Sequence, residues 1–187
     1  GASLQETLFK GAQLDETIFC EVNAESARLT EANLKGAHLT KAVFNNAHFD
    51  KSDLREIDFT EVRLNGAIFS GADLSGVKLN DLQLNQVKLD GANLKNSLFT
   101  GVTLRGANLT QSQMQNVEWV DVDISEADLT DADLTESSFH SVKLLSANLH
   151  GARLDRARWH RVSLEDATLN EISGKGMTFS DTHLKGT

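Results

Sequence analysis

The chain has 187 residues, the length of one ordinary domain, and its 40% hydrophobic and 24% charged residues exclude a disordered polymer. It contains 13 glycines, no proline, no tyrosine and a single cysteine, which excludes an internal disulfide framework. The formal net charge of −9 argues against direct binding to nucleic acid or to an anionic membrane, because both need a basic footprint. The sequence has no apolar run long enough to cross a bilayer.

A five-residue repeat extends over the whole sequence. From residue 4 to residue 184 every fifth residue is large and apolar, which gives 37 consecutive units in one register, with Ala24 and Gly174 as the only exceptions. All 9 Phe and both Trp occupy this central position. Aromatic residues distributed at random over five positions would not coincide in this way, so the period is a property of the fold.

Two further positions of each unit are restricted. Two residues before the central residue the side chain is small or β-branched, with Leu82 and Met177 as the largest exceptions, and 12 of the 13 glycines fall two residues after it. Neither a helix nor a straight strand keeps residues five apart on one side, because their periods are about 3.6 and 2 residues. A short extended piece followed by a turn at the glycine position does so. The sequence therefore predicts a β-solenoid with the central residues inside.

Seven units match the pattern A(D/N)LXX without change: Ala32-Asn33-Leu34, Ala72-Asp73-Leu74, Ala92-Asn93-Leu94, Ala107-Asn108-Leu109, Ala127-Asp128-Leu129, Ala132-Asp133-Leu134 and Ala147-Asn148-Leu149. In this pattern the whole chain resembles the pentapeptide repeat family. The resemblance implies an all-β fold, a right-handed quadrilateral β-helix with four units per coil. The 187 residues then make about nine coils, and we expect residues 1–187 to form a single domain excised from a longer protein.

With four units per coil, residues 20 apart stack on one another and the central residues form four columns. One column is mainly aromatic: Phe19, Leu39, Phe59, Leu79, Phe99, Trp119, Phe139, Trp159 and Phe179. We expect these side chains to fill the core rather than to bind a cofactor. The stretch Ser173-Gly174-Lys175-Gly176 has no bulky central residue, so we expect its amides to exchange faster than those of residues 64–114.

The negative charge is concentrated in one coil. Residues 118–137 hold 8 acidic residues and no basic residue, whereas the other 167 residues hold 19 acidic and 18 basic residues. The acidic residues are Glu118, Asp121, Asp123, Glu126, Asp128, Asp131, Asp133 and Glu136, and an arginine cluster of Arg153, Arg156, Arg158 and Arg161 follows beside His150 and His160. Two interpretations remain open for these twelve charged residues: a solvated surface with pairing between coils, and a charged docking surface for a partner.

No arrangement of residues indicates catalysis. His140 and His160 are 20 residues apart and are expected to stack, but no third metal ligand lies near them. Cys20 belongs to the same column, where its stacked neighbour Thr40 is not a base. A filled rod also lacks the concave pocket that catalysis usually needs. The sequence therefore predicts that the protein is not an enzyme and has no catalytic residue, metal site or cofactor.

Three roles are compatible with this pattern. The first is a non-catalytic scaffold or protein–protein interaction module of a bacterial type, cytoplasmic, with a protein partner and with flanking domains or end-to-end contacts at its open coils. The second, implied by the resemblance, is a DNA mimic that protects DNA gyrase or topoisomerase IV from quinolones or toxins. The confined charge, the unbroken register and the lack of a C-terminal dimerisation helix argue against it. The third is a domain of a secreted effector or secretion-apparatus protein.

Overall fold

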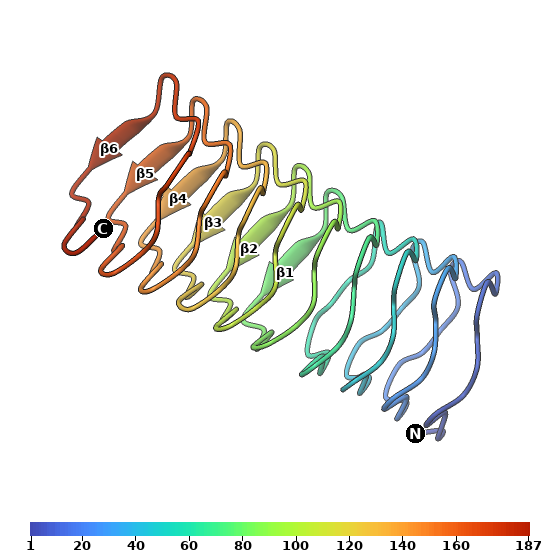
Figure 1. Ribbon diagram of the computed structural model, residues 1–187. Helices are drawn as coiled ribbons and strands as arrows, with labels where there is room; N and C mark the ends of the chain where they lie inside the picture. Colours follow the sequence, from blue (N-terminus) through green and yellow to red (C-terminus); the bar gives the residue numbers. More distant parts are fainter.

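The computed structural model describes residues 1–187 as one continuous coil around a single axis, with the termini at opposite ends of the stack (Figure 1). Parallel bridges join residues 20 apart, from Ser3 with Asn23 to Ser163 with His183. Six strands form one parallel sheet in chain order: β1 (Lys78–Asn80), β2 (Leu98–Thr100), β3 (Glu118–Val120), β4 (Ser138–His140), β5 (Arg158–His160) and β6 (Thr178–Ser180). From β1 to β6 the chain makes five turns, and it contains no helix. The prediction of an all-β solenoid is confirmed.

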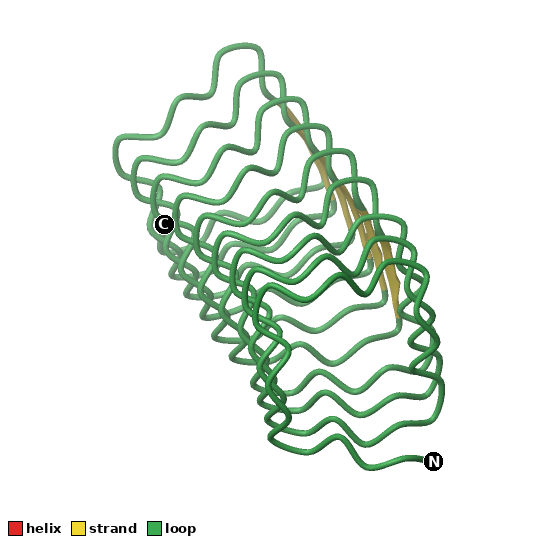
Figure 2. Cartoon of the chain, turned by 90° about the vertical axis from the view of Figure 1, so that its right-hand side faces the viewer, coloured by secondary structure: helices red, strands yellow, loops and turns green.

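Each 20-residue turn consists of four five-residue units separated by tight turns. We number the resulting faces in chain order: face 1 begins with the unit around Leu4, face 2 with Phe9, face 3 with Leu14 and face 4 with Phe19. All six strands lie on face 4 and stack along one side of the coil (Figure 2). The four faces determine which outward side chains can meet, because a residue contacts its counterparts 20 positions away.

The core is one column of 56 buried hydrophobic residues. In the middle of the rod, the central residue and the residue two before it are both buried, and the polar residue between them reaches the surface. Even Ala24, which replaces a large central residue, is only 1% exposed. The two inward positions predicted from the repeat are therefore the two that form the core.

The corner of every unit has a left-handed backbone. The residue two after the central one has a positive φ in all 37 units, in 11 glycines and in 26 other residues. A hydrogen bond across the corner, such as the Ala32 N–H to the Leu29 carbonyl at 3.0 Å, closes each of many such turns. The sequence associated the corner with glycine, but its geometry is imposed by the coil on whichever residue stands there.

The aromatic column lies behind the strands of face 4. The Phe99 and Trp119 rings are stacked with centroids 4.3 Å apart, and Trp119 and Phe139 follow at 5.9 Å. Trp159 meets Phe139 and Phe179 edge to face at 5.7 and 5.4 Å. Each ring therefore packs on the next along the axis, in an arrangement that aromatic pairs prefer, and these side chains fill the core except Phe179, which is exposed in the last turn.

Candidate interaction surface

The eight acidic residues of 118–137, which we call the acidic belt, form a ring around the rod rather than one patch. Each face receives two of them: Glu118 and Asp121 on face 4, Asp123 and Glu126 on face 1, Asp128 and Asp131 on face 2, and Asp133 and Glu136 on face 3. The first of each pair lies between the two inward residues, and the second lies at the corner. The twelve predicted residues therefore do not converge on a single site.

Basic residues of the neighbouring coils neutralise the belt on faces 1 and 3. On face 1, Arg105 of the preceding coil forms ion pairs with Asp123, at 3.4 Å, and with Glu126. On face 3, Arg153 lies 3.0 Å from Asp133, and Arg156 lies 2.6 Å from Glu136. Pairing between coils, one of the two interpretations of the sequence, thus describes these two faces. Arg105 was not among the predicted residues, although its separation of 18 and 21 positions from its partners could have indicated the pairing.

The carboxylates on faces 1 and 3 are stabilised in their ionised form. Partial burial by itself would raise the pKa of Asp133, but hydrogen bonds from Thr135 and Gln115 and the charge of Arg153 outweigh it, so the pKa lies below its usual value. For Asp123, burial likewise would raise the pKa. Hydrogen bonding with Ser125 and the charge of Arg105 outweigh this effect, so the pKa of Asp123 also lies below its usual value. The ionised carboxylates of Asp123 and Asp133 therefore stabilise the folded rod.

Four of the twelve predicted charges lie on face 4 and have no ion pair. Glu118 and Asp121 have no ion pair, and neither do Arg158 and Arg161, which lie two coils further along the same columns. The row of β4, with Ser138 and Ser141 in these two columns, separates the acidic row from the basic row. Face 4 is therefore a hydrogen-bonded sheet with an acidic row at β3 and a basic row at β5. The belt residues of face 2, Asp128 and Asp131, also lack an ion pair.

The two stacked histidines lie within this part of face 4. Their rings are 4.8 Å apart and inclined by 25°, as the spacing of 20 residues predicted. The His160 Nδ1 atom is 2.8 Å from the Ser180 hydroxyl and 3.8 Å from Asp181. No group of three or more His, Cys, Asp or Glu side chains is placed to hold a metal ion. Cys20 is exposed, and its thiol approaches only the His38 carbonyl, at 3.7 Å.

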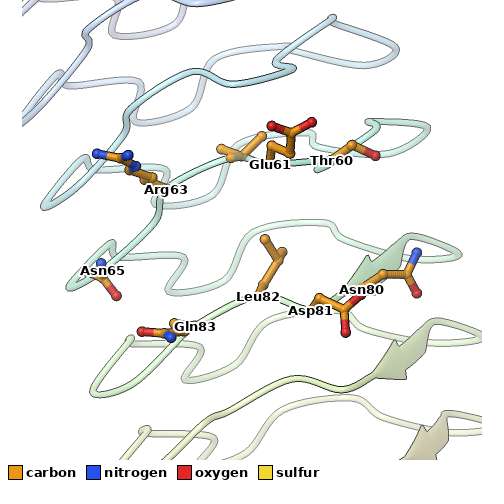
Figure 3. A pocket seen from close by; sticks show the side chains of 9 residues that line it. Thr60, Glu61, Arg63, Asn65, Asn80, Asp81, Leu82 and Gln83 are labelled. Atoms are coloured by element: carbon orange, nitrogen blue, oxygen red, sulfur yellow. The ribbon is translucent and has the colours of Figure 1, made fainter.

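One hollow of the surface lies where two neighbouring coils separate. A cleft of about 430 Å³ opens between residues 60–65 and residues 80–83, and Leu82 projects into the space between the two coils (Figure 3). A second cleft of about 290 Å³ lies on the same boundary, between residues 56–58 and 76–80. Behind them, a core cavity of about 10 Å³ is lined only by hydrophobic side chains. We call this boundary, between residues 56–66 and 75–85, the seam.

Backbone hydrogen bonds between the coils are missing along the seam. The N–H groups of Leu64 and Gly66 make no backbone hydrogen bond to the next coil, and the Gln83 N–H makes none to Val62. On either side the ladder is intact, with the Leu54 N–H 2.8 Å from the Asp73 carbonyl and the Phe69 N–H 2.7 Å from the Lys88 carbonyl. The seam therefore crosses faces 4 and 1 and leaves faces 2 and 3 closed.

Bulky inward residues account for the seam. On face 4, Ile57 stacks on Val77, the one place on this face where two branched aliphatic residues follow each other at the small position. On face 1, Val62 stacks on Leu82, the largest residue at that position of the face. Because interiors are close-packed, the extra volume separates the coils. Leu82 stood out in the sequence as an exception, but it also stacks on Val102, where the Thr103 N–H lies 3.0 Å from the Leu82 carbonyl. The coils separate only at the boundary where Ile57 stacks on Val77 as well.

Two family models match overlapping parts of the chain. The model described as pentapeptide repeats (8 copies) matches residues 1–36, 27–66 and 42–81, and the one described as pentapeptide repeat region matches residues 72–149. The chain belongs to the pentapeptide repeat family. A search of curated protein sequences gave no match.

Solved structures of other pentapeptide repeat proteins share the fold. HetL, a protein involved in heterocyst differentiation regulation from Nostoc sp. strain PCC 7120, has a TM-score of 0.51 and 23% identity, covering 94% of this chain and 88% of HetL. Rfr23 from Cyanothece 51142 has a TM-score of 0.57 and 21% identity, covering 59% and 90%. A trypsin-treated form of QnrB1, a plasmid-mediated fluoroquinolone resistance protein, has a TM-score of 0.53 and 15% identity, covering 96% and 90%. At these identities the similarity concerns the fold alone.

Proposed function

We propose that this pentapeptide repeat protein is a non-catalytic, rod-shaped scaffold that binds other proteins through its outward side chains. The observation that carries the proposal is the filled interior: 56 hydrophobic residues occupy it, the only buried polar side chains are serines, and every charged side chain reaches the surface. The 20-residue register between Ser3 and His183 supports a right-handed quadrilateral coil of about nine turns as the geometry of this rod. We place the scaffold in the cytoplasm, as a single domain of a longer protein. The structure contains no helix that could span a membrane.

Face 4 is the part of the rod that we assign to docking. Charges already paired between coils gain little from a partner, because a new contact must replace an existing one. Glu118, Asp121, Arg158 and Arg161 have no such pair; Glu118 and Arg158 lie in the paired strands β3 and β5, and Asp121 and Arg161 lie at the corners that follow them. Complementary charges on a partner can form ion pairs with all four, and such pairs direct orientation and association rate.

Crosslinking in the cells that encode the protein tests this assignment. The wild-type chain is compared with a variant in which the four free charges are neutralised, Glu118→Gln, Asp121→Asn, Arg158→Gln and Arg161→Gln. A matched control, Asp128→Asn with Asp131→Asn, removes two free charges from face 2. The proposal expects a defined protein crosslinked to the wild type and the control but not to the face 4 variant. Identical crosslinks for all three chains would show that face 4 is not the docking surface, and no protein crosslink for any chain would contradict a scaffold.

Protection of a topoisomerase is the second candidate function. Four carboxylates of the acidic belt remain without an ion pair, and the fold is shared with QnrB1. A DNA mimic needs negative charge along its length, however, and these four lie in one coil on two faces. A supercoiling assay of DNA gyrase with a quinolone decides between the two functions, since protection at micromolar protein would favour this one and its absence would remove it. The third role, in a secreted effector, rests on no particular residue.

A further inference from the structure

The four free charges beside strand β4 are arranged symmetrically about it. Glu118 pairs in register with Ser138, which pairs with Arg158, so an acid and a base lie one strand spacing on either side of Ser138. The corner column repeats this order with Asp121, Ser141 and Arg161, joined by backbone hydrogen bonds through the neighbouring histidines. Negative and positive rows are therefore each about 4.8 Å from the centre line, in opposite directions.

This arrangement is complementary to itself. A rotation of 180° about the direction of β4 brings a second copy face to face with the first, with the two rods antiparallel. The rotation places the acidic row of each copy opposite the basic row of the other, so that Glu118 faces Arg158 of the second copy and Asp121 faces Arg161. Two-fold symmetry then forms each ion pair twice.

The remaining residues of face 4 do not oppose this contact. In the next rows Leu98 lies opposite Thr178 of the second copy, and Thr100 lies opposite Ser180, so no like charges meet. Val120 faces His160, and in the central row Ser138, His140 and Ser141 face their own counterparts in the second copy. The half-buried Leu98 and Val120 side chains, which lie on face 4 in adjacent coils, become covered.

We infer that face 4 binds a second copy of this chain, in an antiparallel dimer with its two-fold axis along β4. The inference rests on the proposed function, because it names the partner of the same docking surface. The five rows from β2 to β6 span about 19 Å along the rod, so the area that the two copies can bury is small for a stable interface. The dimer is therefore weak and depends on its ion pairs, and about 0.5 M salt should dissociate it.

Charge exchange between two variants tests the dimer. The first variant, Glu118→Arg with Asp121→Arg, makes both rows of face 4 positive, and the second, Arg158→Glu with Arg161→Glu, makes both negative. Analytical ultracentrifugation in about 20 mM salt measures association. The dimer requires that the wild type associates, that each variant alone associates at least about tenfold more weakly, and that an equimolar mixture forms a one-to-one complex. Circular dichroism confirms that each variant is folded.

A matched control reverses two free charges of the same coil on another face, Asp128→Arg with Asp131→Arg, and should associate like the wild type. A wild type that stays monomeric in low salt overturns the inference, as does a mixture of the two variants that forms no complex. These failures are distinct from a failure of the scaffold. If the chain is monomeric but still crosslinks to a different protein through face 4, only the dimer is overturned. If the chain dimerises but crosslinks to no other protein, only the scaffold that binds different proteins is overturned.

Discussion

The corners show how strongly the coil constrains single residues. A left-handed backbone costs a non-glycine residue about 1–2 kcal/mol, yet 26 of the 37 corners have a side chain. The coil offsets this cost with hydrogen bonds to the next coil, such as the Gln111 N–H to the Thr130 carbonyl at 2.9 Å. Asn and Asp, which tolerate this region better than other residues, occupy only some of these corners.

Substitutions at two stacked corners of face 2 can measure the free-energy cost of a left-handed backbone. Gly91 has a φ of +65°, and a Cβ added there would meet no atom within 4 Å, so Gly91→Ala changes the backbone energy alone. We expect it to lower the free energy of unfolding by about 1 kcal/mol. Gln111 already adopts φ +56°, so Gln111→Ala should change stability by less than about 0.5 kcal/mol. Chemical denaturation compares the two, and equal losses would show that the corner backbone is not the cause.

Asp133 connects a single carboxyl to the acid stability of the rod. Its pKa in the folded protein lies below the ordinary value of 3.8, so the ionised form stabilises the fold at neutral pH, and this contribution is lost as the pH falls through the folded pKa. Asp133→Asn should therefore lower stability by about 1 kcal/mol at pH 7 and leave the two proteins alike near pH 2. Denaturation at both pH values checks this, with Asp131→Asn, at an exposed corner without side-chain hydrogen bonds, as control. A constant difference at all pH values would contradict the linkage.

At the scale of the coil, the seam should be the most open boundary in the middle of the rod. Leu64 and Gly66 lack inter-coil hydrogen bonds, whereas Leu104 and Gly106, the same residue types at the same positions of face 1, donate at 2.7 and 3.0 Å. We expect the first two amides to exchange at least about tenfold faster than the second two. Residue-resolved hydrogen exchange by NMR measures these four amides, and equal protection would mean that the coils are closed at the seam in solution.

A substitution at Leu82 tests the cause of the seam. The next four turns of face 1 have valine at this position, and there the ladder is intact. Leu82→Val should therefore restore the hydrogen bond from the Gln83 N–H to the Val62 carbonyl. It should also slow the amide exchange of Leu64 and Gly66 towards the rates of Leu104 and Gly106. Val142→Ala, on the same face but away from the seam, should leave their exchange unchanged. If Leu82→Val left the exchange fast, the bulk of Leu82 would not be what separates the coils.

The seam also bears on the predicted weakness of residues 173–176. These residues are exposed, and the neighbouring Phe179 side chain is 53% accessible to solvent, which supports fast exchange there. Part of the reference range 64–114 lies in the seam, however, so the contrast should be sharp only against residues beyond it. The sequence alone treated that range as uniform, because each unit in it has its large central residue.

Across the whole molecule, the sequence predicted what repeats and could not predict what depends on stacking. The two inward positions and the aromatic column follow from residue type at a fixed period, so they could be derived without coordinates. The candidate site could not be derived in this way, because the acidic belt is one cluster along the sequence but is divided among four faces in space. Its pairing with Arg105 and the opening at Leu82 both depend on residues in the adjacent coil, which only the coil length identifies.

The repeat makes one turn of the coil removable without a change of fold. Deletion of residues 87–106 joins Gln86 to Ala107, keeps every residue on its original face, and stacks Trp119 on Leu79 in the aromatic column. Because each coil contacts only its neighbours, we expect a folded, shorter rod whose melting temperature falls by less than about 10 °C. Deletion of residues 108–110 removes three positions instead, which moves polar residues into the inward positions of all later units and should abolish cooperative unfolding. Thermal unfolding followed by circular dichroism and by the fluorescence of the two buried tryptophans compares them. Similar melting of the two deletion variants would mean that the 20-residue register does not hold the rod together.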